Sequence, residues 1–277
     1  MKQILLSLFT FSTLVGQAQT VNLSKGQLIT ITITSTQDME MTGMQIKNNS
    51  TSTSLLQVND AGKDNFTASY KLDKLNLNME MMGQQQSFDS EKPEDKESEI
   101  GKSFAGKIGK AVPVLINRNT GEVIVKDPEA EADTSSAAGQ ENPLEGIMES
   151  FGAAGDDATA GTAFFVVPKD KKNGDSWTDS SSTNKMKEVK TYTLKSIDGG
   201  IATIQLFSTM QGSSSMETQG MQMDMSLSAK TEGEILVDQK TSLVKKRSSV
   251  MDLTGTLDMM GQSVPITSKA IVNITYN

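Results

Sequence analysis

The segment Asp38-Met39-Glu40-Met41-Thr42-Gly43-Met44 is one of four variants of a single pattern along the chain. In each variant, methionines alternate with polar residues beside a glycine, which is typical of a β-strand that runs into or out of a tight turn. The pattern therefore indicates strand ends at four places. The other three variants are Asn78-Met79-Glu80-Met81-Met82-Gly83-Gln84, Gly220-Met221-Gln222-Met223-Asp224-Met225 and Leu257-Asp258-Met259-Met260-Gly261-Gln262.

The alternation extends well beyond the methionines. In residues 27–41, Ile29, Ile31 and Ile33 share the parity of Met39 and Met41, while threonines fill the positions between the isoleucines. Alternation with period two and β-branched residues indicates strands with one apolar face. Similar runs fill the C-terminal third of the chain, so we expect about ten strands, mostly antiparallel.

The predicted helical content is far too small to cover such a sheet. One short amphipathic helix is predicted at residues 144–151, with Leu144, Ile147, Met148 and Phe151 as its apolar stripe. A helix of about ten residues is only about 15 Å long. Apolar strand faces need a cover, so the sheet must curl on itself. We therefore expect a mostly β fold: a curled antiparallel sheet, either a half-barrel or an open barrel, with one short helix.

The N-terminus has the layout of a secretory signal peptide, residues 1–18. Lys2 supplies the positive region, the apolar run at residues 4–15 is too short to span a bilayer, and Gly16 and Ala18 suit a cleavage site. We expect an exported protein, periplasmic or extracellular after cleavage, with no transmembrane segment in the mature chain. Residues 19–277 are predicted to form a single β-rich domain with a mobile acidic insertion, rich in Ala, Gly and Ser, at residues 127–161.

Composition argues against several classes of function. The net charge is −8 and no basic cluster is present, so nucleic-acid binding is not expected. The absence of cysteine rules out disulfides, and the absence of histidine rules out Ser-His-Asp and Cys-His catalysis and removes the usual zinc ligand. We predict no cofactor and no metal. The oligomeric state does not follow from the sequence.

Two short motifs suggest chemistry but are explained without it. Ser182-Thr183-Asn184-Lys185 matches the S-x-x-K motif, yet the companion S-D-N and K-T-G elements are missing. Asp60 and Asp64 lie in a turn cluster that lacks the spacing of a calcium loop, and turn chemistry accounts for them. We therefore predict that the protein is not an enzyme.

Three stretches resemble one uncharacterised family. They are Val112-Pro113-Val114 through Gly121, Pro168 through Gly174-Asp175-Ser176-Trp177, and Thr191-Tyr192-Thr193-Leu194. In these the chain is similar to the exported bacterial proteins of domain-of-unknown-function family 6263. The resemblance implies a β-rich secreted protein and no known activity. The expected architecture is also similar, at the level of fold alone, to the half-barrels of periplasmic lipoprotein carriers such as LolA.

The 17 methionines are the one unusual chemical feature. They suit the core face of a sheet, an adaptable apolar mouth, or a Cu(I) site built from thioethers. Our leading hypothesis is a non-enzymatic binding or carrier protein for an apolar small molecule or lipid in the hollow of the sheet. The alternatives are a structural or interaction protein of the cell envelope, and a methionine-based Cu(I) binder. The candidate ligand-facing residues are Met39, Met41, Met79, Met81, Met221, Met223, Met225 and Met259.

Overall fold

A computed structural model describes residues 19–41, 43–125, 160–182, 186–218, 221–259 and 262–277. The predicted signal peptide and the predicted helix at residues 144–151 lie outside the described residues, as does all but the last two positions of the predicted insertion at 127–161. Within the described part, the strands form one 12-stranded sheet in which every paired strand is antiparallel to its neighbour. The predicted fold class, a mostly β protein with a curled antiparallel sheet, is confirmed.

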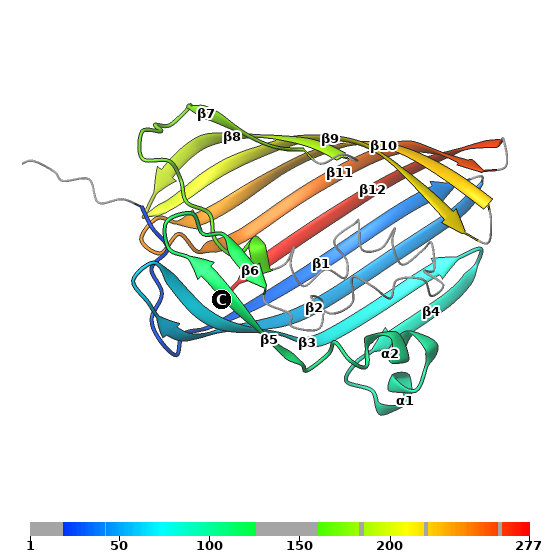
Figure 1. The fold of residues 1–277 in the computed structure, drawn as a ribbon, viewed down its shortest axis with the longest axis horizontal. Helices are drawn as coiled ribbons and strands as arrows, with labels where there is room; N and C mark the ends of the chain where they lie inside the picture. Colours follow the sequence, from blue (N-terminus) through cyan, green and yellow to red (C-terminus); the bar gives the residue numbers. More distant parts are fainter. Residues whose placement is uncertain (1–18, 42, 126–159, 183–185, 219–220, 260–261) are drawn as a thin grey trace, which may run out of the picture.

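The two central strands of the sheet are the first and the last in the sequence. The order is β6-β5-β3-β2-β1-β12-β11-β10-β9-β8-β7, and the short β4 pairs with β3. Ile31 of β1 lies opposite Tyr276 of β12. The N-terminal and C-terminal halves are thus joined along the middle of one curved sheet (Figure 1). The strands are β1 (Leu28–Met41), β2 (Met44–Ala61), β3 (Asn65–Met81), β4 (Gln84–Asp89), β5 (Ala111–Asn117), β6 (Val123–Val125), β7 (Ser176–Ser182), β8 (Met186–Asp198), β9 (Ile201–Thr218), β10 (Met221–Asp238), β11 (Val244–Met259) and β12 (Gln262–Tyr276).

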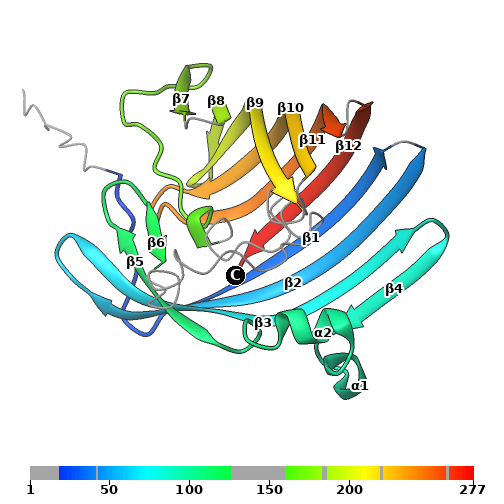
Figure 2. The ribbon, with the colours of Figure 1, turned by 45° about the vertical axis from the view of Figure 1, so that its right-hand side comes forward.

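The main hydrophobic cluster shows which face of the sheet is concave. It unites Phe66 and Tyr70 of β3 with Leu194 of β8 and Ile204 of β9, although these strands lie in different halves of the sheet. Side chains from both halves meet only if the sheet curves around them. Figure 2 shows this curvature of the ribbon. We call this cluster the closed end. Its further members include residues outside the strands, namely Val21, Leu23, Ala160, Ala163, Phe164, Val167 and Leu243.

Glycines on the concave face let the long strands bend. The register places Gly233 of β10 beside Leu206, and Gly255 of β11 beside Leu227 and Ile266, all with the parity of the concave face. A Cβ at Gly255 would lie 2.6 Å from the Leu227 Cδ2 atom and would also meet the Ser226 carbonyl oxygen. Glycine inside a strand commonly marks such a bend or close backbone approach.

Two short helices cover one edge of the sheet in the described part of the chain. They are α1 (Pro93–Lys96) and α2 (Glu99–Phe104). The Ser98 side chain caps α2 by accepting a hydrogen bond of 3.0 Å from the Gly101 amide. The ring of Phe104 stacks on Phe88 of β4 at a centroid distance of 6.0 Å. Among the described residues, no helix is both long enough and apolar enough to cross a bilayer.

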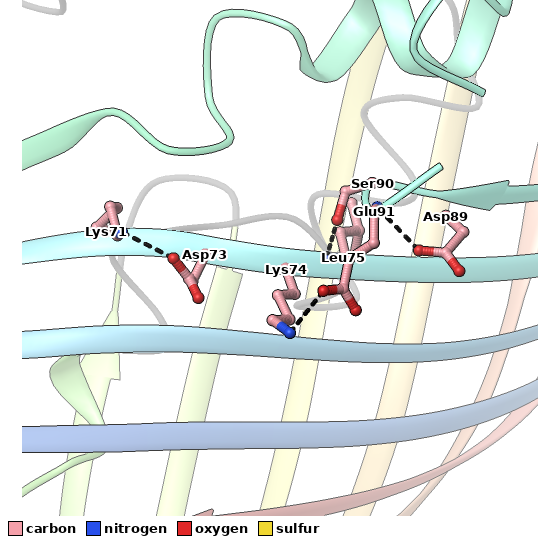
Figure 3. A network of polar contacts seen from close by, with 7 residues as sticks. All are labelled: Lys71, Asp73, Lys74, Leu75, Asp89, Ser90 and Glu91. Carbon is pink, nitrogen blue, oxygen red and sulfur yellow. Dashed lines mark hydrogen bonds and ion pairs between the residues drawn. The ribbon is translucent and has the colours of Figure 1, made fainter. Parts of the chain in front are cut away.

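Polar contacts fasten the chain between β4 and α1 to strand β3 (Figure 3). The Leu75 amide donates to the Ser90 Oγ atom at 2.9 Å, and the Lys74 ammonium lies 2.6 Å from the Glu91 carboxylate. The Glu91 amide donates to the Asp89 carboxylate at 3.0 Å. These contacts account for the local charges as part of a turn.

Candidate functional site

The four methionine variants gather at one end of the sheet. Each flanks a hairpin: β1–β2, β3–β4, β9–β10 and β11–β12. Because β1 and β12 are antiparallel neighbours, Met41 lies opposite both Met44 and Ile266. In the other half, Met223 lies opposite Met259. Repeats that are far apart in the sequence therefore end side by side, opposite the closed end; we call this region the methionine end.

A second hydrophobic cluster lies on the concave face at the methionine end, and we call it the methionine cluster. Its four buried members are Met39, Ala229, Leu253 and Ile266. Within the described residues, all of its members come from strands β1, β2 and β9 to β12, in contrast to the closed end, where loop residues join the strands. The partly buried members are Met41, Ile46, Met210, Leu227, Met251 and Leu257.

The predicted site residues fall into three groups. Met39, which is 7% exposed, and Met41 belong to the methionine cluster. Met79, Met81 and Met225 are half-buried and share the concave face by register, opposite Asn48, Ile46 and Leu257 respectively, but they are not members of the cluster.

The third group is described by its backbone alone: Met221 and Met223 lie in β10, and Met259 lies in β11. A ligand-facing role stays a prediction for all eight candidate residues. The cluster residues that the motif missed, such as Met210, Met251 and Leu253, sit away from the glycine turns. The sequence signal for them is strand alternation: Met210 has the parity of Leu206 in β9, and Met251 and Leu253 have the parity of Leu257 in β11.

Polar side chains also lie on the concave face, within and beside the methionine cluster. The Gln37 amide donates to the Ser268 hydroxyl at 3.2 Å, and the Ser208 hydroxyl donates to the Glu188 carboxylate at 2.9 Å. Glu188 also pairs with Lys190 at 3.0 Å. Ser208 and Ser268 are 4% and 6% exposed, so their hydrogen bonds offset the cost of burial. Polar groups thus interrupt the apolar surface of this face near the methionine cluster.

Two tyrosines mark the boundary of the closed end. Burial raises the pKa of Tyr276 to about 12, although the hydrogen bond to Thr162 and the Arg247 guanidinium both act to lower it. The Tyr276 and Thr162 hydroxyls lie 2.8 Å apart. Burial also raises the pKa of Tyr192, which stacks on Trp177 with a centroid distance of 5.7 Å. Trp177 therefore packs at the sheet edge, since β7 is the last strand of the sheet.

The short chemical motifs do not assemble into a site in the described residues. Ser182 is the exposed last residue of strand β7, and Lys185 lies outside the described residues. Asp60 pairs with Lys25 at 3.4 Å on the surface. No group of three or more acidic residues able to hold a metal occurs in the described part of the chain. The Cu(I) and non-enzyme hypotheses stay predictions.

The opposite, convex face carries a broad open depression of about 700 Å³ across β8 to β11. Most of its lining side chains have the other strand parity from the methionine cluster; they include Lys187, Gln211, Ser228 and Thr254. Several serines and threonines line it beside Met186 and Leu227, and the depression is open to solvent. It is therefore not the enclosed apolar hollow expected from the sequence.

The solved structures that resemble this chain share little sequence with it. No curated protein matches it. Among solved structures, it is similar to one titled "Lipid-protein interactions in lipovitellin", with 11% sequence identity and a TM-score of 0.49, over 91% of this chain but only 25% of that chain. It is also similar to an outer membrane channel from Pseudomonas putida F1, with 6% identity and a TM-score of 0.24, over 95% of this chain and 98% of that chain.

The likeness to LolA-type carriers stays a prediction. The family resemblance predicted from the stretches around Val112, Trp177 and Tyr192 is confirmed. The model of a family of unknown function, DUF6263, matches residues 63–244, which is well over half of the chain. The chain therefore belongs to the DUF6263 family.

Proposed function

We propose that this protein is an exported, non-enzymatic carrier that binds the apolar part of a lipid-like ligand against the methionine cluster. One observation carries the proposal: among the described residues, the members of the cluster all come from strands, whereas the closed end of the same face includes loop residues that pack over the strands. An apolar strand face that no described loop residue joins is suited to an apolar ligand.

The side chains of the cluster suit ligands of variable shape. Met41, Met210 and Met251 are partly buried, so their thioethers pack on neighbours on one side and offer apolar surface on the other. Methionine is unbranched and flexible, and it adapts to irregular partners better than isoleucine or valine does. A carrier of acyl chains needs this adaptability. The signal peptide predicted at residues 1–18 supports an exported carrier.

Binding of a fluorescent fatty acid to the purified full-length mature protein tests the proposal. The test variant is Met251→Glu, which puts a charge on the concave face beside Leu253. The control is Ile271→Glu, on the neighbouring strand β12; Ile271 lies opposite Val250 and Thr36, on the convex face, and is 42% exposed. We expect Met251→Glu to weaken binding at least about tenfold, because a carboxylate does not tolerate apolar surroundings, and Ile271→Glu to leave binding unchanged.

Native mass spectrometry and lipid extraction of the same preparation give an independent readout. We expect a lipid-like molecule to co-purify with the wild type and to be depleted in Met251→Glu. Absence of any bound apolar molecule, together with no binding of the fluorescent fatty acid, would overturn the proposal. Equal losses in both variants would also count against it, because they would place the apolar contact elsewhere.

A further inference from the structure

Arg247 is a cation set into an apolar part of the concave face. In the register of β11 it lies directly opposite Ile235 of β10 and Ile274 of β12. These isoleucines are 1% and 7% exposed and belong to the closed end. Arg247 itself is half-buried. A strand position with this parity and these neighbours would be expected to carry an apolar residue.

The described residues give Arg247 neither an ion pair nor a hydrogen bond. Among the described residues, the carboxylates of Asp179 in β7 and Glu188 in β8 act on the pKa of Tyr192 in this part of the sheet. Glu188 is already paired with Lys190 and with Ser208. An arginine that loses part of its hydration without gaining a carboxylate carries an uncompensated cost.

Two phenol rings lie within the electrostatic reach of the Arg247 guanidinium. Burial is the main influence on the pKa of Tyr192 and of Tyr276, and in both the guanidinium acts in the opposite direction by favouring the charged form. The two tyrosines come from strands on opposite sides of β11 in the sheet, Tyr192 from β8 and Tyr276 from β12. A guanidinium fork suits an oxyanion, since it can donate two parallel hydrogen bonds.

The methionine cluster lies farther along the same face of the same strand. Met251 and Leu253 follow Arg247 by four and six residues, which at about 3.3 Å per residue corresponds to about 13 and 20 Å. The positions beside this path on β12 are Val272 and Ala270, opposite Ser249 and Met251. Small and apolar side chains thus connect the cation to the methionine cluster.

We propose that Arg247 binds the anionic head group, a carboxylate or a phosphate, of an amphiphile whose tail extends along β11 and β12 to the methionine cluster. This inference rests on the proposed carrier function and adds to it the charge of the ligand and its direction on the sheet. It predicts that the head group lies toward the closed end and the tail toward the methionine end.

Matched ligands separate the head group from the tail. The probes are palmitate, hexadecyl phosphate, hexadecanol (a neutral ligand with the same chain) and inorganic phosphate, each titrated into the full-length mature protein. We expect palmitate and hexadecyl phosphate to bind at least about tenfold more tightly than hexadecanol, and inorganic phosphate to bind far more weakly than hexadecyl phosphate.

Variants then assign the preference to one residue. Arg247→Met keeps an apolar-compatible chain and removes the charge, so we expect it to abolish the preference for anionic ligands while hexadecanol binds as before. Arg247→Lys keeps the charge without the fork and should retain part of the preference. The matched control is Lys246→Met on the other face of β11, where Lys246 is exposed opposite Leu236 and Thr275, and it should change nothing.

The outcomes distinguish this inference from the carrier function. If hexadecanol binds as tightly as palmitate, or if Arg247→Met weakens the binding of both ligands equally, Arg247 does not recognise the head group. The proposed carrier function would be unaffected by that result. If inorganic phosphate binds as tightly as hexadecyl phosphate, the alkyl chain adds nothing to binding. That result would overturn the inference that head group and tail occupy one continuous site. If none of the chain-bearing probes binds, both proposals fail. Circular dichroism of Arg247→Lys and Arg247→Met shows whether the fold is retained.

Discussion

The closed end and the methionine end are built on one concave face by the same long strands, yet they are filled differently. At the closed end, Val21 and Phe164 join strand residues such as Ile31 and Leu56, and all four are no more than 5% exposed. At the methionine end, six of the ten described members of the cluster are only partly buried, against eight of 34 at the closed end. The same alternation thus yields a covered core where loop residues join it, and an apolar strand surface where no described loop residue does.

The contrast extends to the backbone and to side-chain stiffness. At the closed end, the covering segment is hydrogen-bonded to the turn before β11: the Phe165 amide donates to the Ser242 carbonyl at 2.9 Å, and the Val244 amide donates to the Ala163 carbonyl at 2.9 Å. Isoleucine, valine and aromatic side chains, which have few rotamers, dominate there. Methionine and leucine dominate the other cluster. The closed end is thus suited to stabilising the fold, and the methionine end is suited to packing against partners of different shape.

The largest expected effect comes from truncating a side chain at the closed end. Phe66 is fully buried, and the Arg118 guanidinium lies 4.1 Å from the centre of its ring. We expect Phe66→Ala to cost about 3–5 kcal/mol of unfolding free energy, through the lost burial and the cavity left behind. Met251→Ala, at the half-buried methionine end, should cost only about 1–2 kcal/mol. Urea unfolding measures both, and equal losses would contradict the difference between the ends.

Alkaline pH should weaken the closed end through Tyr276. Its pKa is raised to about 12 in the folded protein, against about 10 for an unfolded tyrosine. The folded state therefore holds the phenol proton more strongly. This stabilisation is fully present below pH 10 and is lost as the pH rises from 10 through 12, by about 2–3 kcal/mol in all.

The variant that isolates this effect is Tyr276→Phe, which cannot ionise. Below pH 10 it should lose about 0.5–1.5 kcal/mol for the missing hydrogen bond to Thr162. Between pH 10 and 12 its stability should then fall less steeply than that of the wild type, as followed by urea unfolding at a series of pH values. Parallel curves for the two proteins would show that Tyr276 does not titrate as its burial indicates.

A smaller loss of stability is expected from Gly255→Ala, at the bend near the methionine end. The new methyl group would press on the Leu227 side chain and the Ser226 carbonyl oxygen. Overpacking of this kind costs about 1–3 kcal/mol. Gly106→Ala is the control, because a Cβ there meets nothing within 4 Å and the φ angle is not in the left-handed region. If both variants unfold at the same urea concentration as the wild type, Gly255 is not needed for the curvature.

Much of this architecture could be predicted from the sequence, because strand parity is a local signal. The isoleucines and methionines of residues 27–41 predicted the buried face of β1, and the deficit of helix predicted the curl. Strand β4 was not expected, since Gln84, Gln85 and Gln86 carry no apolar alternation. The central pairing of β1 with β12 could not be predicted either, because it depends on contacts between the two ends of the chain.

The candidate site was predicted only in part, for a related reason. The methionine–glycine motif identifies the strand ends, but the cluster also includes residues several positions away from the turns. Ile266 and Leu253 join it through register between neighbouring strands, and a motif holds no information about register. Arg247 was likewise missed: in the sequence it stands in Lys245-Lys246-Arg247, which looks like a solvated charge run. Alternation places Lys246 and Arg247 on opposite faces, and this is the signal that could have singled out Arg247.

The smallest expected change in stability comes from replacing methionine by leucine at the methionine end. Met39→Leu and Met251→Leu nearly conserve volume and apolar character, so each should change the unfolding free energy by less than about 1.5 kcal/mol. Leucine, however, is branched and has fewer rotatable bonds than methionine has. If the methionines are there to adapt to ligands, the double variant should bind fewer chain shapes at almost unchanged stability.

Saturated and cis-unsaturated fatty acids of equal length measure that breadth. We expect the wild type to bind both with similar affinity, and the Met39→Leu/Met251→Leu variant to discriminate between them by about 1 kcal/mol or about fivefold, because a stiffer surface fits one shape at the expense of the other. Leu56→Met at the closed end is the matched control and should leave the ratio at its wild-type value. If the ratio of the two affinities is unchanged in both variants, the methionines serve only as apolar packing. The two ends of the sheet would then differ in the loop residues that pack on them but not in their ability to adapt to a ligand.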